Sequence, residues 1–599
     1  MRYGFRRKSL RFTIAAFVVA IAATFAHARK KASRELTPMT REMTGDQRIA
    51  HALNRFAFGQ RSADVDSIGR MGVDRWIEQQ LNPDAIPENP VLEMKLRPLE
   101  TLHMSSADLE EEYPAPATLR AIREGRLPLP ADPVKRALIR ELVERLERKQ
   151  AIAGENDSTN GKPRASVLDA HEIESMRAEE QIEALAGLPR AQLRRLRDSA
   201  PVELQRRIQM LNSPTQVVNQ DLAAAKLVRA VYSNRQLEEV LTDFWYNHFN
   251  VFVDKGADRY LVTAYERDVI RPHVLGHFHD LLLATAQSPA MLFYLDNWQS
   301  AAADPRPNPN RRPRGLNENY ARELMELHTL GVDGGYTQKD VTEVARCFTG
   351  WTIREPRRGG DFEFNARMHD AGEKHVLGVT IPAGGGMEDG LNVIDILAAH
   401  PSTARSISKQ LTIRFVADDP PEALVERMAR KFQETHGDLR EVMRTMIHSP
   451  EFWDANYFRA KIKSPLELVA SAVRAVNGDL DYSFARQPLL NQLGEPLYRK
   501  QEPNGYSNRG ADWLDGGSLM ARMNFAMALA ENKVAGIQVD TWQFAAEPAV
   551  ITRALLVTGA SADTERSMLS VETESAAARG ATGMSMAGVA LASPDFQRR

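Results

Sequence analysis

Apolar side chains recur at three- and four-residue spacing along most of this 599-residue sequence. The pattern is clearest over residues 222–232 and 235–245, where it would place the apolar side chains on one face of a helix. The same spacing predicts further helices over residues 260–271, 274–287, 317–330, 338–348, 403–416, 421–435, 438–448, 465–476 and 517–531. We therefore expect a mainly α fold, built as a single large multi-helical domain.

One helix start is especially well marked. Ser464 precedes Pro465, and Glu467 follows at the third helical position, so the serine and the glutamate can form a capping box. Proline at the first helical position fits the same assignment, because the amide that it lacks would be unpaired there. We expect a helix to begin at residue 465.

Residues 104–215 differ in composition from the rest of the chain. Charged helical stretches over 136–149 and 172–210 flank a Gly-, Asn- and Ser-containing linker at 154–163. This composition predicts a charged helical insertion that projects from the main domain as a hairpin or lid. A partly ordered insertion is the alternative interpretation.

Extended structure is predicted only over residues 361–390. Residues 362–364 and 376–381 are expected to pair as a small β-hairpin element, which ends at the glycines of 383–386. Residues 559–590 are rich in Ala, Ser, Gly and Met, and we expect them to form a mobile segment.

The first 28 residues have the three parts of a secretory signal peptide. Residues 1–11 carry five basic side chains and no acidic one, residues 12–26 are mostly apolar, and Ala26-His27-Ala28 ends in small residues that suit cleavage. An uncleaved membrane anchor is the alternative, but the apolar run is short for a membrane span. We expect an exported protein, periplasmic or extracellular, with no stable membrane span after cleavage.

Charge and cysteine content narrow the classes of function. Without residues 1–28 the basic count falls from 77 to 72 against 79 acidic residues, which leaves a net charge near −7. Such a balance disfavours nucleic-acid partners, because binding to phosphates needs an excess of Lys and Arg. Cys347 is the only cysteine, so an internal disulfide is excluded and stability must come from a packed core.

Several ordered sequence blocks resemble one large bacterial family, called domain of unknown function (DUF) 1800. The blocks lie at 51–59, 243–250, 317–332, 336–341, 349–351, 369–374, 505–513 and 593–596. The resemblance runs over about residues 47–599 and implies an exported, mainly helical protein, but no reaction. It also implies a partner class, because genes of this family often accompany those of exported proteins similar to phosphatases and sulfatases.

Polar residues in two of the predicted helices are candidate metal ligands. His248 follows an aromatic stretch, and Glu323, Glu326 and His328 lie beside the Tyr320, Leu324 and Leu327 stripe of the 317–330 helix. Paired carboxylates and imidazoles can hold a divalent metal cofactor. The alternatives are structural: His248 would bond to nearby backbone, and Glu326 would pair with Arg322 four residues earlier.

Candidate catalytic residues lie in the non-helical region. His369, Asp370 and Lys374 bring three different ionisable groups within six residues, which suits acid–base chemistry, and Glu323 is a further candidate. A simple turn at Asp370 is the alternative. A loop with Gly505, Tyr506 and Trp513 could stack on a sugar ring or pack against the core.

Two hypotheses of function follow. In the first, the chain is an exported metal-dependent enzyme, and its site is made of Glu, His and Asp residues. In the second, it is a non-catalytic exported scaffold or partner of a phosphatase- or sulfatase-like protein, and the 104–215 insertion supplies the contact surface. The usual zinc-protease, nucleotide-binding and serine-hydrolase motifs are absent from the sequence.

Overall fold

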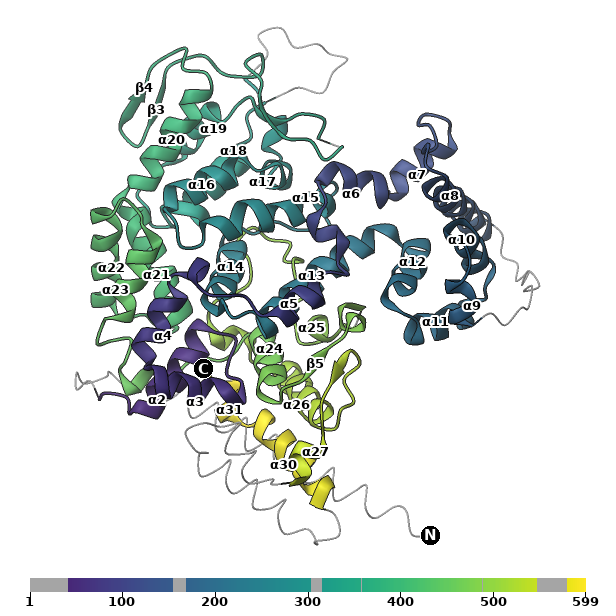
Figure 1. The fold of residues 1–599 in the computed structure, drawn as a ribbon. Helices are drawn as coiled ribbons and strands as arrows, with labels where there is room; N and C mark the ends of the chain where they lie inside the picture. Colours follow the sequence, from purple (N-terminus) through teal and green to yellow (C-terminus); the bar gives the residue numbers. More distant parts are fainter. Residues whose placement is uncertain (1–40, 155–168, 303–314, 357, 487, 547–578) are drawn as a thin grey trace.

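Helices supply nearly all of the regular structure, and they pack around one large core (Figure 1). The structure is a computed structural model, and it describes residues 41–154, 169–302, 315–356, 358–486, 488–546 and 579–599. The mainly α prediction is confirmed. Within these residues, no helix is both long enough and apolar enough to cross a membrane. The predicted signal peptide, residues 1–28, lies outside the described residues.

The insertion interrupts the first half of the main body. Before the insertion it contains α2 (Gly45–Phe56), α3 (Ser62–Met71), α4 (Val73–Gln80), η1 (Pro83–Ala85), α5 (Pro90–Leu96), η2 (Glu100–His103) and α6 (Ser106–Glu112). After the insertion it contains α13 (Pro214–Tyr232), α14 (Gln236–His248), α15 (Asp258–Ala264), η3 (Tyr265–Ile270), η4 (Arg271–His273), α16 (Phe278–Gln287), α17 (Pro289–Tyr294), η5 (Asn297–Gln299), α18 (Glu318–Glu323), η6 (Leu324–Thr329) and α19 (Gln338–Cys347).

The second half of the body completes the fold. Its helices are α20 (Met387–Ala399), α21 (Pro401–Phe415), α22 (Glu422–Glu434), α23 (Leu439–Ile447), η7 (Ala455–Tyr457), α24 (Pro465–Ala475), η8 (Tyr482–Arg486), α25 (Leu489–Gln492), η9 (Gly510–Trp513), α26 (Gly516–Ala530), α27 (Trp542–Ala546), α30 (Arg579–Ala592) and α31 (Pro594–Gln597). The Ser464–Glu467 capping box is present at the start of α24, as predicted.

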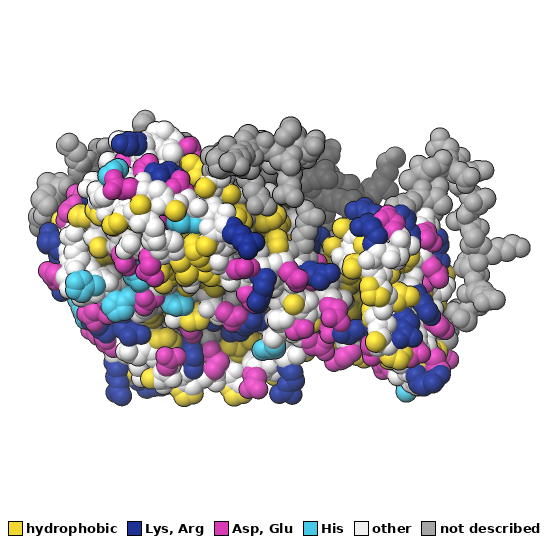
Figure 2. Space-filling view, turned by 90° about the horizontal axis from the view of Figure 1, so that it is seen from above, with side chains coloured by type: hydrophobic (Ala, Val, Ile, Leu, Met, Phe, Trp, Pro, Cys, Tyr) yellow, Lys and Arg dark blue, Asp and Glu magenta, His cyan; other side chains and the backbone are white. Residues whose placement is uncertain are grey.

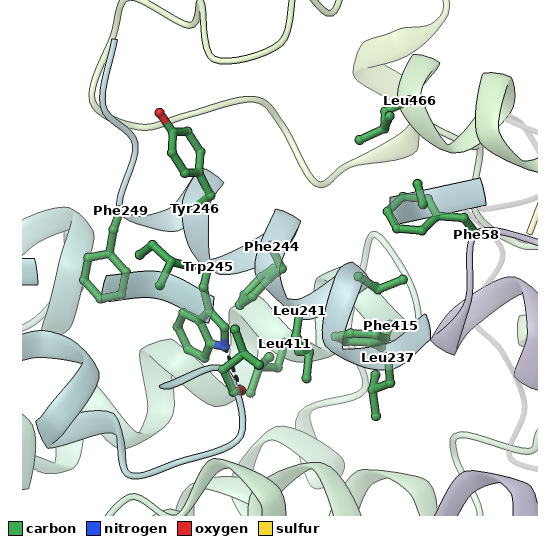
Figure 3. Close-up of a cluster of buried hydrophobic side chains, with 14 of the residues drawn as sticks. Phe58, Leu237, Leu241, Phe244, Trp245, Tyr246, Phe249, Leu411, Phe415 and Leu466 are labelled. Atoms are coloured by element: carbon green, nitrogen blue, oxygen red, sulfur yellow. Dashed lines mark hydrogen bonds between the residues drawn. The ribbon is translucent and has the colours of Figure 1, made fainter. Parts of the chain in front are cut away.

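The centre of the core lies around α14. Trp245 and Phe249 are fully buried there, and the Trp245 indole N–H donates to the Val274 carbonyl at 3.2 Å (Figure 3). Leu411 and Phe415 of α21 belong to the same buried cluster. Asp243 and Asn247 stand four residues apart on this helix and therefore share one of its faces.

The insertion forms a lobe with its own core. It comprises α7 (Pro116–Arg123), α8 (Pro133–Gly154), α9 (Ala170–Glu174), α10 (Ala178–Gly187), α11 (Arg190–Ser199) and α12 (Val202–Asn212). Its buried side chains run from Leu119 to Leu211 and form a cluster separate from the main core. Figure 1 shows this lobe projecting to the right of the body. Since α6 packs on α15 of the body, the separate lobe begins at α7 rather than at residue 104.

Three two-stranded antiparallel sheets are present in the described residues: β1 (Trp351–Ile353) with β2 (Phe362–Phe364), β3 (Lys374–Val376) with β4 (Val379–Ile381), and β5 (Asp479–Leu480) with β6 (Ile537–Gln538). The expected strand positions are confirmed, but the expected pairing of 362–364 with 376–381 is wrong. Leu377 and Gly378 both have positive φ, which makes a two-residue hairpin turn inside the second segment. The second segment therefore folds back on itself, so that Val379–Ile381 pairs with Lys374–Val376 and not with Phe362–Phe364.

The predicted mobile segment, 559–590, is only partly covered by the described residues. Its last residues belong to helix α30, which packs against α26 and α27. Met586, Ala590 and Leu591 of α30 are buried. Small and sulfur-containing side chains gave no strong helical stripe in the sequence, but they allow α30 to lie close to its neighbours.

Two helices widen into π-helical turns. These are η3, which continues α15, and η6, which continues α18. A π-helical turn holds an extra residue, so the helical stripe changes face within it. In η6 this change buries Met325 and His328, whereas Leu327, predicted for the core stripe, is only half-buried.

Candidate functional site

A buried ion-pair group lies where α13, α14 and η3 meet. The Lys226 ammonium lies 3.0 Å from a carboxylate oxygen of Asp243 and 3.5 Å from one of Glu266. The Tyr498 hydroxyl donates to Glu266 at 2.6 Å. Burial disfavours the charged lysine, but the two carboxylates outweigh it and raise the pKa of Lys226. A lysine placed on an apolar helix face thus stays ionised.

These groups lie beside a small cavity. Its volume of about 40 Å³ offers room for about three water molecules. The lining side chains come from segments that are far apart in the sequence: Lys226, Asp243, Asn247, Arg414, Glu467, Glu495, Tyr506, Trp513 and Arg599. The two sequence blocks around Asp243 and Tyr506, considered separately in the sequence, therefore face one space.

Two glutamates of this cavity have opposite electrostatic surroundings. Glu495 accepts a hydrogen bond from the Leu466 N–H at 2.7 Å, and burial, with the nearby Asp243 charge, raises its pKa to about 8. Burial also disfavours ionisation of Glu467, but Arg414 and Arg599 outweigh it and lower its pKa to about 2. At neutral pH a protonated and an ionised glutamate therefore line the same cavity, the arrangement from which acid–base roles arise.

Residues 493–509, the covering loop, close the cavity. The Asn247 side chain accepts from the Tyr506 N–H and donates to the Tyr506 carbonyl, both at 2.6 Å. Asn250 donates to the carbonyls of Lys500 and Glu502, both at 3.0 Å. The end of α14 thus fixes the backbone of the covering loop. A ligand larger than a few waters can enter only if this loop moves.

Positive charge accumulates next to the cavity. Six buried side chains, which we call the cation cluster, carry it: Arg55, Arg414, Lys461, Lys463, Arg522 and Arg599. Glu467 pairs with Arg414 and Arg599, and Asp418 pairs with Lys461. Arg55, Lys463 and Arg522 form no ion pair with any described residue, and burial lowers the pKa of each. Buried cations in excess of anions are unfavourable unless another anion offsets them.

The predicted catalytic residues His369 and Lys374 meet at a different place. Both side chains contact the same carboxylate oxygen of Asp389 on α20, His369 at 3.0 Å. The His369 ring also contacts the Thr349 carbonyl at 2.8 Å. All three ionisable side chains are at most 3% exposed, so this cluster is closed to solvent.

Asp370 takes part in a separate interaction on the same loop. Its carboxylate binds the Arg346 guanidinium at 2.9 and 3.1 Å, which helps to lower its pKa, and it accepts from the Gly372 N–H at 2.9 Å. The contact with the Gly372 N–H forms the turn at Asp370 that was the alternative prediction. Asp370 therefore supports the loop, while its backbone carbonyl accepts from Lys374.

The predicted metal ligands form two pairs. His328 is buried and His248 is partly buried, with ring centroids 6.4 Å apart, and the His248 Nε2 atom lies 3.2 Å from the His328 carbonyl. Burial lowers the pKa of His248 to about 4 and that of His328 to about 3, so both imidazoles are neutral. The expected backbone contact of His248 is confirmed.

Glu323 and Glu326 make the second pair. Partial burial and the charge of Glu326 raise the pKa of Glu323. Glu326 accepts from the Tyr336 hydroxyl at 3.2 Å, and Arg322 pairs with Glu318 rather than with Glu326. Across the described ranges, no group of three or more His, Cys, Asp or Glu side chains is arranged to hold a metal ion.

Comparison with known proteins gives one match. A family model described as "Protein of unknown function (DUF1800)" matches residues 51–598. The chain belongs to this family. Neither a curated protein nor a solved structure matches it. The range matched by the DUF1800 model includes the lobe and the cavity residues from Lys226 to Trp513, so both lie within the region that defines the family.

The residues that line the cavity of this DUF1800 chain differ in how well the sequence predicts their burial. Lys226 stands four residues from Leu222 and from Ala230, on the apolar face of α13, and a lysine there requires a buried acid. Glu495 lies in a Gly-Glu-Pro loop, where nothing in the local pattern predicts burial. Asp389, the shared partner of His369 and Lys374, likewise looks like an ordinary acid in the first turn of a helix.

Proposed function

We propose that this chain is an exported enzyme that performs general acid–base catalysis on a small anionic substrate in the cavity. The observation that carries the proposal is the protonated carboxyl group of Glu495, which shares the cavity with the ion-paired carboxylate of Asp243 beside the cation cluster. In this proposal, Glu495 is the proton donor. The ion-paired carboxylate of Asp243 faces it as the base or nucleophile.

The anionic character of the substrate follows from the charge balance. Arg414 and Arg599 line the cavity, and among the described residues they share one buried anionic partner, Glu467. A bound carboxylate, phosphate or sulfate group would offset part of the remaining positive charge of the cation cluster. Movement of the covering loop would admit the substrate and then exclude water from it.

The test is turnover of phenyl phosphate, phenyl sulfate and phenyl glucuronide, three anionic compounds whose phenol leaving group is a weak acid and therefore departs faster when it receives a proton. We expect at least one to be hydrolysed, with the rate falling above about pH 8 as Glu495 loses its proton. Glu495→Gln should lower kcat by roughly 10²–10⁴-fold. The matched control is Glu502→Gln, an exposed glutamate of the same loop, which should not change the rate.

Two outcomes would contradict the enzyme proposal. One is that no compound of the panel is hydrolysed and phosphate or sulfate fails to raise the melting temperature of the protein. The other is turnover that survives Glu495→Gln unchanged. Export is tested separately, by cell fractionation and amino-terminal sequencing, and we expect the mature protein to begin at Arg29.

The lobe supports a second candidate function, as partner of an exported phosphatase- or sulfatase-like protein. Its separate core allows it to present a surface without disturbing the cavity. Co-purification with the full chain, and with a chain lacking residues 116–211, is the experiment. If the same proteins are recovered with both chains, the lobe is not the contact surface.

A further inference from the structure

The lobe contains a hollow that its own helices do not fill. The volume is about 580 Å³, within the range of about 300–1,000 Å³ that small-molecule sites occupy. Its walls are mostly apolar and come from α7, α8, α11 and α12: Leu119, Leu142, Leu146, Leu193, Ile208 and Leu211. An apolar space of this size is unfavourable when empty, because its lining loses packing contacts.

The rim of the hollow is positively charged. Arg145 and Arg148 of α8 and Arg194 and Arg197 of α11 line it, and no Asp or Glu is among the described lining residues. Glu141 pairs with Arg145 and Arg148, each at 2.7 Å, from outside the lining. Arg194 forms no ion pair with any described residue, and the Arg148 side chain is 58% exposed. The mouth therefore presents guanidinium groups to solvent above an apolar interior.

Figure 2 shows the surface of the lobe at the right of the view, where hydrophobic side chains lie among Lys, Arg, Asp and Glu side chains. We propose that the hollow binds a free long-chain fatty acid. Its acyl chain would fill the space between the helices, and its carboxylate would bind the arginines of the rim. Guanidinium groups suit this role, because they bind carboxylates through two parallel hydrogen bonds.

Size and charge together favour this ligand. A single acyl chain is apolar along its length, as the walls are, and it carries one anionic group at one end, as the rim requires. An inorganic anion would leave the apolar walls unfilled, and a cationic amphiphile would meet four arginines. The inference is independent of the proposed reaction, since the hollow lies in the lobe and the cavity lies in the body.

The experiment uses the full chain and cis-parinaric acid, a fluorescent fatty acid whose emission rises in apolar surroundings. We expect saturable binding and displacement of the probe by palmitate. Hexadecyltrimethylammonium, with the same chain length and a cationic head, should compete at least about tenfold less well, which corresponds to about 1.4 kcal/mol. Equal competition by the two amphiphiles would overturn the proposal.

Variants locate the site. Combined Arg148→Glu and Arg194→Glu substitutions should weaken palmitate binding at least about tenfold, and Ala186→Trp, which fills the hollow, should abolish it. Arg140→Glu, on the exposed side of α8, is the matched control and should bind palmitate normally. Circular dichroism checks that each variant is folded. Unchanged binding in the Arg148/Arg194 variant, or no displacement by palmitate in the wild type, would overturn the proposal.

Discussion

Asp389 shows how one carboxylate can hold a loop together. It is fully buried, and it accepts from both Lys374 and His369. Asp389→Asn would leave the Lys374 ammonium buried without a counter-charge, so the free energy of unfolding should fall by about 3–5 kcal/mol. Urea denaturation measures this. Asp395→Asn on the same helix is the control: its side chain is 66% exposed and should cost at most about 0.5 kcal/mol.

Glu495 should make stability depend on pH. The folded protein holds its proton up to about pH 8, whereas an unfolded glutamate releases it near its ordinary pKa of 4.5. Between these values the folded state binds more protons, so the contribution of Glu495 to stability declines as pH rises. Glu495→Gln removes this loss. Relative to wild type, its free energy of unfolding should rise by roughly 3–5 kcal/mol across that window.

Denaturant titrations at several pH values test the Glu495 prediction. Glu502→Gln, in the same loop but exposed, should follow the wild-type pH dependence throughout. A stability difference between wild type and Glu495→Gln that stays constant from pH 4.5 to about pH 8 would mean that the carboxyl ionises as freely in the folded protein as in the unfolded one.

At the scale of elements, the covering loop depends on Gly505. This residue has φ +65°, and a Cβ there would clash with the carbonyl of Asn247. Gly505→Ala should therefore cost the roughly 1–2 kcal/mol of a left-handed alanine plus the displacement of the loop from α14. The control is Gly494→Ala, because Gly494 also has positive φ but faces open space. Equal losses of stability in the two variants would show that the Asn247 contact does not restrain the loop.

Individual elements were more predictable from the sequence than the site. The capping box at Ser464 and the spacing along α14 are local signals, and both gave the right helix. The π-helical turn η6 was missed, because a 3.6-residue stripe contains no sign of an extra residue, and this exchanged Leu327 for His328 in the core. Glu495 was missed because its burial depends on elements that are distant in the sequence.

The lobe and the body have separate hydrophobic cores, joined by the buried Arg206–Asp221 ion pair between α12 and α13, and we expect them to unfold in separate transitions. Ile208 is buried in the core of the lobe, and Leu237 is buried in the core of the body. Ile208→Ala should lower the transition of the lobe by about 2–5 kcal/mol and leave that of the body unchanged, while Leu237→Ala should do the reverse. Calorimetry of the full chain measures both. A single transition that shifts equally in the two variants would contradict this.

The cation cluster also constrains the order in which parts of the fold can be completed. Arg55 comes from α2, the first helix that the structure describes, and Arg599 lies beside Lys461 through paired backbone hydrogen bonds. Synthesis proceeds from the amino terminus. The cavity wall therefore cannot be completed until residue 599 has been made and has paired with Lys461, so the cavity closes late in folding.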